Sequence, residues 1–165
     1  MTVTIERESE IPLPFSEQEV AEAVVSETLD YEDCPYEVQV NIILTTNEEI
    51  HKINLEQRGV DAPTDVLSFP MIAYAFPSDF TVLEADSMDN FDPDTGELLL
   101  GDIVISVDKV IEQAEKYNHG VKREYAFLIA HSMLHLFGYD HMDELERETM
   151  EHKQEEILTR LNITR

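Results

Sequence analysis

The chain has 165 residues, which is the length of one ordinary domain, and such a domain needs no disulfide to complete its core. It carries 36 acidic and 11 basic residues, a formal net charge of −25. This charge excludes the broad basic surface that usually attracts nucleic acid, although not a small local basic site. The sequence shows no secretory signal, no apolar run long enough to span a membrane and only one cysteine, Cys34. We therefore predict a single cytoplasmic domain over residues 1–165, without membrane partners.

The first half of the chain predicts alternating strands and helices. The expected strands are 2–7, 38–44 and 66–69, and the expected helices are 16–30 and 46–57. Ser16 with Glu19, and Thr46 with Glu49, form capping boxes that mark the two helix starts. Pro70 stops the third strand.

Residues 71–97 differ in character from the rest of the chain. They contain seven acids, two prolines and a DPDTG turn signal, but no Lys or Arg. We expect a long acidic loop or hairpin insertion. Structureless loops of this length are uncommon in compact domains, so the segment is expected to be functional or mobile.

The second half predicts one more strand and three helices. These elements are a strand at 98–106 and helices at 107–117, 121–137 and 142–161. The helix at 121–137 is the most apolar of the chain. The full order of elements indicates an α+β fold, with a small four-stranded mixed sheet packed against about five helices.

The strongest motif is HSMLHLFGYDH, which contains His131, His135 and His141. Two histidines four residues apart on a helix project from the same face, and such a pair commonly binds zinc. Gly138 ends the helix and lets the chain turn back, so that His141 can return to the same point in space. The motif predicts three neutral nitrogen ligands for one Zn²⁺ ion, with room for water, as in an open catalytic site.

Two other interpretations of this motif need to be considered. Histidines on a helix often only pack in a core or face solvent, but burying two imidazoles without a partner in so apolar a helix would be costly. The spacing is also that of the zincin-like metal helix of metzincin proteases, HExxHxxGxxH. Ser132 stands where those proteases have their glutamate base, so peptide hydrolysis by that route lacks its base.

Three blocks of the sequence carry a family resemblance over nearly the whole chain, most loosely in 71–97. The first contains His131, Leu134, His135, Leu136, Gly138, Tyr139, Asp140 and His141. The second contains Asn54, Arg58, Thr64, Asp65, Val66, Leu67, Ser68 and Phe69. The third contains Gly101, Asp102, Ile103, Ile105 and Ser106, and His119 with Glu124 match a further short segment. In these blocks the chain resembles the YbeY rRNA maturation factors, metal-dependent single-strand endoribonucleases of bacteria. Ser132 replaces the usual glycine of that family, which should matter little for metal ligation.

The resemblance implies a zinc ion on the three histidines and a functional Arg58. Arg58 is the only base between Lys52 and Lys109, in a region dense with acids. Its guanidinium is suited to bidentate contact with a phosphate. The alternative is an ordinary ion pair with a nearby carboxylate, such as Asp61 or Asp65.

Several further residues have open roles at this point. Asp65, Asp102 and Asp140 can orient ligand imidazoles, and Asp140 is also a candidate proton acceptor. Turn or cap chemistry explains Asp65 and Asp102 equally well. Glu124 is either catalytic, or part of a buried ion pair, or a charge at a helix start. His119 is either an acid–base group or a loop residue.

The expected function is metal-assisted cleavage of RNA phosphodiester bonds, with Arg58 stabilising charge on the phosphoryl oxygens. The resemblance implies maturation of the 16S rRNA 3′ end and ribosome quality control, with the ribosome and small-subunit ribosomal proteins as partners. The rivals are a hydrolase of another substrate and a non-catalytic, zinc-containing ribosome-assembly factor. The acidic insert is either a flap near the metal cleft that repels free RNA or a solvated loop that serves only solubility.

Overall fold

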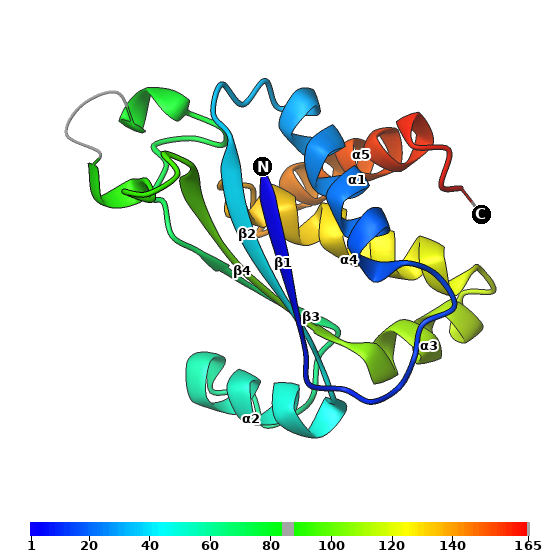
Figure 1. Ribbon diagram of the computed structural model, residues 1–165. Helices are drawn as coiled ribbons and strands as arrows, with labels where there is room; N and C mark the ends of the chain where they lie inside the picture. Colours follow the sequence, from blue (N-terminus) through cyan, green and yellow to red (C-terminus); the bar gives the residue numbers. More distant parts are fainter. Residues whose placement is uncertain (84–87, 165) are drawn as a thin grey trace.

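Four strands form one mixed sheet in the order β1-β2-β4-β3 (Figure 1). The computed structural model describes residues 1–83 and 88–164. The strands are β1 (Thr2–Arg7), β2 (Val38–Thr45), β3 (Val66–Pro70) and β4 (Leu98–Ser106). Neighbours β1, β2 and β4 run parallel, and β3 pairs antiparallel with β4 at one edge. The predicted α+β fold with a four-stranded mixed sheet is confirmed.

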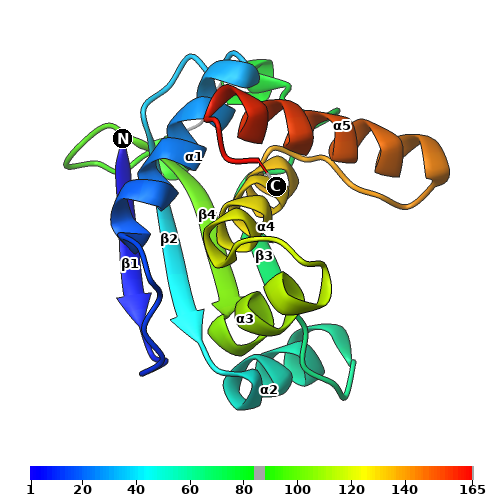
Figure 2. The ribbon, with the colours of Figure 1, turned by 90° about the vertical axis from the view of Figure 1, so that its right-hand side faces the viewer.

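The described residues also form five α-helices. The outermost, α5, packs against α1 and α4, and Figure 2 shows these three helices in front of one face of the sheet. The helices are α1 (Glu17–Tyr31), α2 (Asn47–Arg58), α3 (Val107–Lys116), α4 (Val121–Leu136) and α5 (Glu144–Arg160). Both predicted capping boxes form. Ser16 Oγ accepts a hydrogen bond from the backbone of Glu19 (3.3 Å), and Thr46 Oγ1 accepts one from Glu49 (3.2 Å).

Each face of the sheet contributes to a separate apolar cluster. Ile103 and Ile105 of β4 lie in the main core together with α1 and α4. Val104, between them in sequence, packs instead with Leu67 of β3 and Ile50 of α2. Side chains alternate across a strand, so this arrangement assigns each β4 residue to a face. The helix carrying the histidines covers the first face, and α2 covers part of the other.

Gly101 allows α4 to lie close to the sheet. The register of β4 shifts where Gly101 pairs with Val40, and the glycine has φ +149°. A Cβ atom there would lie 2.4 Å from the Phe69 carbonyl oxygen and 2.9 Å from Leu136 Cδ2 of α4. No side chain larger than hydrogen therefore fits between β3 and α4 at this point.

The segment 71–97 packs against the body of the protein at several points. It contains the short 3₁₀ helices η1 (Phe80–Leu83) and η2 (Met88–Asn90). Ile72 and Leu83 are buried in the main core, and the Phe80 ring meets Phe137 edge-on at 5.6 Å. Part of the predicted loop therefore contributes to the core.

Some acids of this segment make internal hydrogen bonds. Glu97 is buried and accepts a hydrogen bond from Thr2 Oγ1 (2.9 Å). Asp92 accepts one from Gln39 Nε2 (2.7 Å). Two of the seven acids, Glu84 and Asp86, lie outside the described residues. The bonded acids fasten the segment to β1 and β2.

Replacing Gly101 tests the close approach of α4 to the sheet. Gly101→Ala should lower the free energy of unfolding by about 2 kcal/mol or more, because the new methyl group meets backbone and Leu136. Urea denaturation measures this loss. Gly120→Ser is the control, since a Cβ there meets nothing within 4 Å and serine is a good helix N-cap. Equal stability of the two variants would contradict the packing argument.

Candidate metal centre

The apolar helix α4 presents His131 and His135 on one face, as their spacing predicts. Their Nε2 atoms lie 3.1 Å apart, and the ring centroids are separated by 4.6 Å. Both side chains are only partly exposed, whereas Ser132, Met133 and Leu134 between them are fully buried. The burial of α4 therefore holds the two imidazoles in a fixed relation at the edge of the core.

The turn at Gly138 brings the third histidine to the first two. Gly138 has φ +96°, and the backbone N–H of Tyr139 donates to the carbonyl of Leu134 (3.0 Å), as in a glycine-terminated helix. The His141 ring lies 5.6 Å from that of His131 and 5.1 Å from that of His135, centroid to centroid. One nitrogen from each ring lies within 4.8 Å of the others, an arrangement that can hold a metal ion.

The outward nitrogens of two histidines have partners that orient the rings. His135 Nδ1–H donates to the Tyr139 carbonyl (2.9 Å), which leaves Nε2 free as a ligand. His131 Nδ1 lies 3.0 Å from the side-chain amide of Gln154 on α5. An amide can turn its oxygen or its nitrogen toward an imidazole, so Gln154 can accept the Nδ1 proton when Nε2 is a ligand.

Gln154 is a site residue that the motif did not reveal, because it lies 23 residues after His131 on another helix. It is 1% exposed and lies among Met150, Ile157 and Leu158, the apolar residues by which α5 packs on the core. A polar residue within this apolar stripe was the sequence signal by which Gln154 could have been found. A buried amide needs a hydrogen-bond partner, and the partner of the Gln154 amide is His131.

Burial favours the neutral forms of His131 and His135. Burial first, and then the neighbouring His135 and His141, lower the pKa of His131 to about 4. Burial is also the main cause that lowers the pKa of His135. Near neutral pH these two imidazoles therefore carry no charge, which is the state in which an imidazole binds a metal ion.

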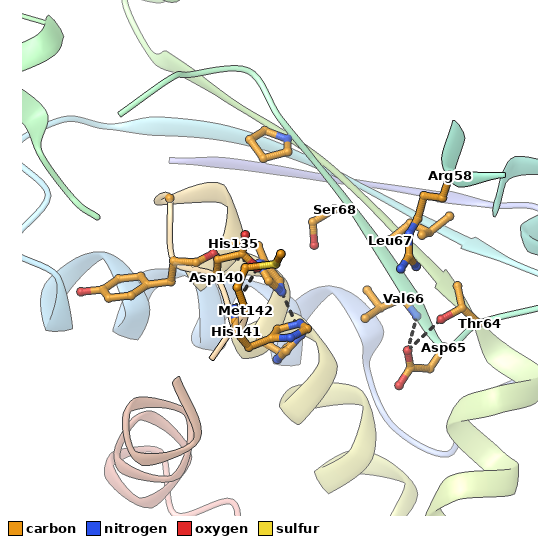
Figure 3. A pocket seen from close by; sticks show the side chains of 14 residues that line it. Arg58, Thr64, Asp65, Val66, Leu67, Ser68, His135, Asp140, His141 and Met142 are labelled. Atoms are coloured by element: carbon orange, nitrogen blue, oxygen red, sulfur yellow. Dashed lines mark hydrogen bonds between the residues drawn. The ribbon is translucent and has the colours of Figure 1, made fainter. Parts of the chain in front are cut away.

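The three histidines open into a cavity of about 640 Å³. Arg58, at the last turn of α2, lines the same cavity, and Figure 3 shows Ser68 of β3 between it and the histidines. Among the described residues of 71–97, none lines the cavity, although Tyr74 packs beside Gly138 at its border. That the acidic segment 71–97 acts as a flap that repels free RNA stays a prediction.

Arg58 does not form the ion pair considered as its alternative role. Its Nη1 donates only a long hydrogen bond, 3.4 Å, to Asn54 Oδ1. Asp61 pairs with His51 at 2.7 Å, and Asp65 Oδ1 accepts from the backbone of Val66 at 2.8 Å. Within the described part of the chain, no carboxylate lies within 4.0 Å of the guanidinium, which is exposed and free to take an anion.

Asp140 lies at the mouth of the cavity, as its place beside His141 suggests. Its Oδ1 accepts a hydrogen bond from the backbone N–H of His141 (2.8 Å), which steadies the turn that carries this ligand. The carboxylate is exposed, so Oδ2 remains available to solvent or substrate.

Three of the residues with open roles belong to one chain of hydrogen bonds that reaches the cavity at Asp65. His119 Nε2 lies 2.5 Å from Glu124, whose other oxygen accepts from Gln113 Nε2 at 2.6 Å. Gln113 Nε2 also lies 3.3 Å from Asp65 Oδ2, and Asp65 lines the cavity. His119 and Glu124 are buried. Both therefore reach the site only through Gln113 and Asp65.

Asp102 and Ser132 lie apart from the histidine ligand atoms. Asp102 pairs with Phe69, on the face of the sheet covered by α2, and accepts from Asn41 Nδ2 (3.0 Å). Sheet alternation therefore separates it from α4, and the structure does not bring it to the ligands. Ser132 is fully buried, and its hydroxyl bonds that of Ser68, which ties α4 to β3.

The fold is thus an α+β domain in which a buried helix and the turn after it gather three histidines that can hold a metal ion, beside a free arginine. Comparison with known proteins gives the family. The model of the family described as endoribonuclease YbeY matches residues 3–162. Proteins named endoribonuclease YbeY from Lachnoclostridium phytofermentans and Agathobacter rectalis are 56% and 58% identical, each over all of both chains. This chain belongs to the YbeY endoribonuclease family. The solution structure of TM1509 from Thermotoga maritima is similar, with a TM-score of 0.56 and 25% identity, over 98% of this chain and 92% of that one.

Removing two histidines together tests the metal site. The double variant His131→Ala/His135→Ala should hold well below one metal ion per chain by elemental analysis, because one imidazole cannot retain the ion alone. The control is His51→Ala/His152→Ala, which removes two histidines that lie outside the cluster. Full metal content in the first variant would exclude this site.

Gln154 offers a separate test of ligand orientation. Gln154→Met should weaken metal affinity by about 10- to 100-fold, because His131 loses the acceptor for its Nδ1 proton. Gln154→Glu keeps an acceptor and should restore most of the affinity. Competition with a chelator measures the affinity, and Gln39→Met serves as a control for loss of a half-buried amide that does not line the cavity. Equal affinities in Gln154→Met and the wild type would show that Gln154 only fills space.

Proposed function

We propose that this protein is a zinc-dependent endoribonuclease that hydrolyses phosphodiester bonds in single-stranded RNA. One observation carries the proposal: three imidazoles and a guanidinium that is unpaired among the described residues line the same cavity. A site for a cation beside a site for an anion suits a phosphate ester. The names of the relatives, endoribonuclease YbeY, support RNA as the source of that phosphate.

The ligand set supports zinc. Zinc bound to imidazole at about 2.0–2.1 Å in a tetrahedral site requires its nitrogens to lie roughly 3.3 Å apart. His131 Nε2 and His135 Nε2 are 3.1 Å apart. Within residues 1–83 and 88–164 the cluster offers three nitrogen ligands and no fourth protein ligand, which leaves one position open, as in catalytic zinc sites. When bound, zinc would supply Lewis-acid polarisation of a phosphoryl oxygen and acidify water.

Arg58 and Asp140 supply the rest of the chemistry. The Arg58 guanidinium binds two phosphoryl oxygens and stabilises the negative charge that develops on them. Asp140 Oδ2 accepts the proton of the attacking oxygen, while Oδ1 remains held by the His141 backbone. Asp65 is fixed by Gln113 and the Val66 backbone, so it shapes the cavity without neutralising Arg58.

The buried Ser132 weighs against a peptidase. A metzincin uses a glutamate at this position as its general base. Here the side chain is enclosed between α4 and β3 and bonded to Ser68, so it cannot take a proton in the cavity. The arginine across the cavity is also better matched to a phosphate than to a peptide carbonyl.

The charge of the whole chain indicates how RNA reaches the site. A net charge of −25 repels RNA at long range, so binding needs a local contact or a partner that presents the strand. We propose the 3′ end of precursor 16S rRNA as the substrate, within ribosome quality control. Ribosomal proteins of the small subunit would supply affinity that this acidic chain lacks.

Arg58 is the residue whose replacement tests the proposal most directly. Arg58→Lys should reduce cleavage of a defined single-stranded RNA by at least about tenfold, because lysine keeps the charge but loses the planar fork. Zinc content and melting temperature should not change, since Arg58 is exposed and has only one long hydrogen bond. The loss should appear in kcat.

Two controls make the assay decisive. Lys52→Gln removes a cation from the same helix that does not line the cavity, and it should leave cleavage unchanged. His135→Ala should abolish cleavage if no contaminating nuclease is present. A purified wild-type protein with full zinc that leaves the RNA intact would instead favour a non-catalytic assembly factor.

A further inference from the structure

A second cavity borders the histidines between α4 and α5. It measures about 300 Å³ and shares His131 and His141 with the first cavity, but Arg58 does not line it. Its remaining wall includes Phe127 of α4 and Arg147 of α5. In Figure 3, Arg58 lies on one side of the histidine cluster and the ribbon of α5 on the other. The two cavities therefore meet at the metal ligands and extend to opposite sides.

Arg147 is unpaired in a protein where most cations are paired. Six of the 11 basic residues have a carboxylate within 4.0 Å: Arg7, Lys52, Lys109, Arg123, Lys153 and Arg160. In the part of the chain that the structure describes, neither Arg58 nor Arg147 has one. These two arginines are also the ones that line the cavities meeting at the histidines.

Arg147 has no ion pair among the described residues, although a carboxylate that could pair with it lies close in the sequence. Glu151 lies four residues further along α5 and lines the same cavity, a spacing at which ion pairs commonly form. Across the described ranges, 1–83 and 88–164, no ion pair of Arg147 is found. The guanidinium is exposed and free for an external anion. Phe127 and Met150 give the same cavity apolar wall, which suits the face of a base or a sugar.

We propose that this second cavity is a further RNA subsite, in which Arg147 binds a phosphate on the other side of the scissile bond from Arg58. The proposal rests on the function proposed above and adds the path of the strand. A single strand entering past Arg58 crosses the three histidines and leaves between α4 and α5. Two free guanidiniums thus hold the backbone on both sides of the cut in a chain that otherwise repels it.

The test compares Arg147→Gln with the wild type on two RNAs. One is a single-stranded oligonucleotide long enough to cross both cavities, and the other is a trinucleotide. On the long RNA, KM should rise by about 3- to 10-fold with little change in kcat. The slope of log kcat/KM against log salt should become shallower by about 0.7, the value for one phosphate contact on a single strand. The loss should be several-fold smaller on the trinucleotide.

Two further variants separate a subsite from a general charge effect. Lys122→Gln removes an exposed cation that lines neither cavity, so its KM and salt slope should match the wild type. Glu151→Gln removes the carboxylate that competes with phosphate in the second cavity, so it should lower KM on the long RNA. Zinc content and melting temperature of all three variants should stay at wild-type values, since each side chain is exposed.

The possible failures are distinguishable. A wild-type enzyme that cuts both RNAs, with Arg147→Gln equal to it on the long one, would overturn the subsite alone. An equal loss for Arg147→Gln and Lys122→Gln would do the same, because it would show only a response to net charge. A wild-type protein that cuts neither RNA would overturn the proposed function, and the subsite with it.

Discussion

The burial of α4 against the sheet is the constraint on which the site depends. The helix is enclosed along most of its length, and at Gly101 the sheet leaves no room even for a methyl group. Two imidazoles on such a helix have few positions open to them. Their outward nitrogens are held by Tyr139 and by Gln154, so the packing of the core sets the direction of the ligand atoms. The cavity is in this sense a product of core packing.

Electrostatics adds a second constraint. A chain with 36 acids could neutralise all of its 11 bases, and in the described residues six of the bases have a carboxylate within 4.0 Å. Arg58 escapes because the nearby carboxylates are already engaged: Asp61 with His51, and Asp65 with Gln113 and the Val66 backbone. The carboxylates nearest to Arg58 in sequence are thus bonded elsewhere, and they leave its guanidinium available to an anion. An anion that arrives there finds the cation already free of a competitor.

Much of this could be predicted from the sequence, where the signal is local. Helix caps, the order of strands and helices, and the three-histidine motif all depend on spacings within a few turns, and they are found as expected. The free state of Arg58 could not be predicted, because it depends on which partners Asp61 and Asp65 choose in three dimensions. Asp102 shows a related limit: only the strand pairing reveals that it lies on the sheet face that α2 partly covers, away from α4. Gln154 was missed because its histidine lies on another helix.

The contact between Gln154 and His131 also joins the metal site to the outer helix α5. If an ion at the histidines fixes the His131 ring, it fixes the Nδ1–H donor whose proton the Gln154 side chain of α5 accepts. Ion occupancy and the docking of α5 are then thermodynamically linked, and the linkage is reciprocal. A change that loosens α5 weakens ion binding by the same factor by which loss of the ion loosens α5. The last helix of the chain would therefore show local unfolding and faster amide exchange whenever the centre is empty.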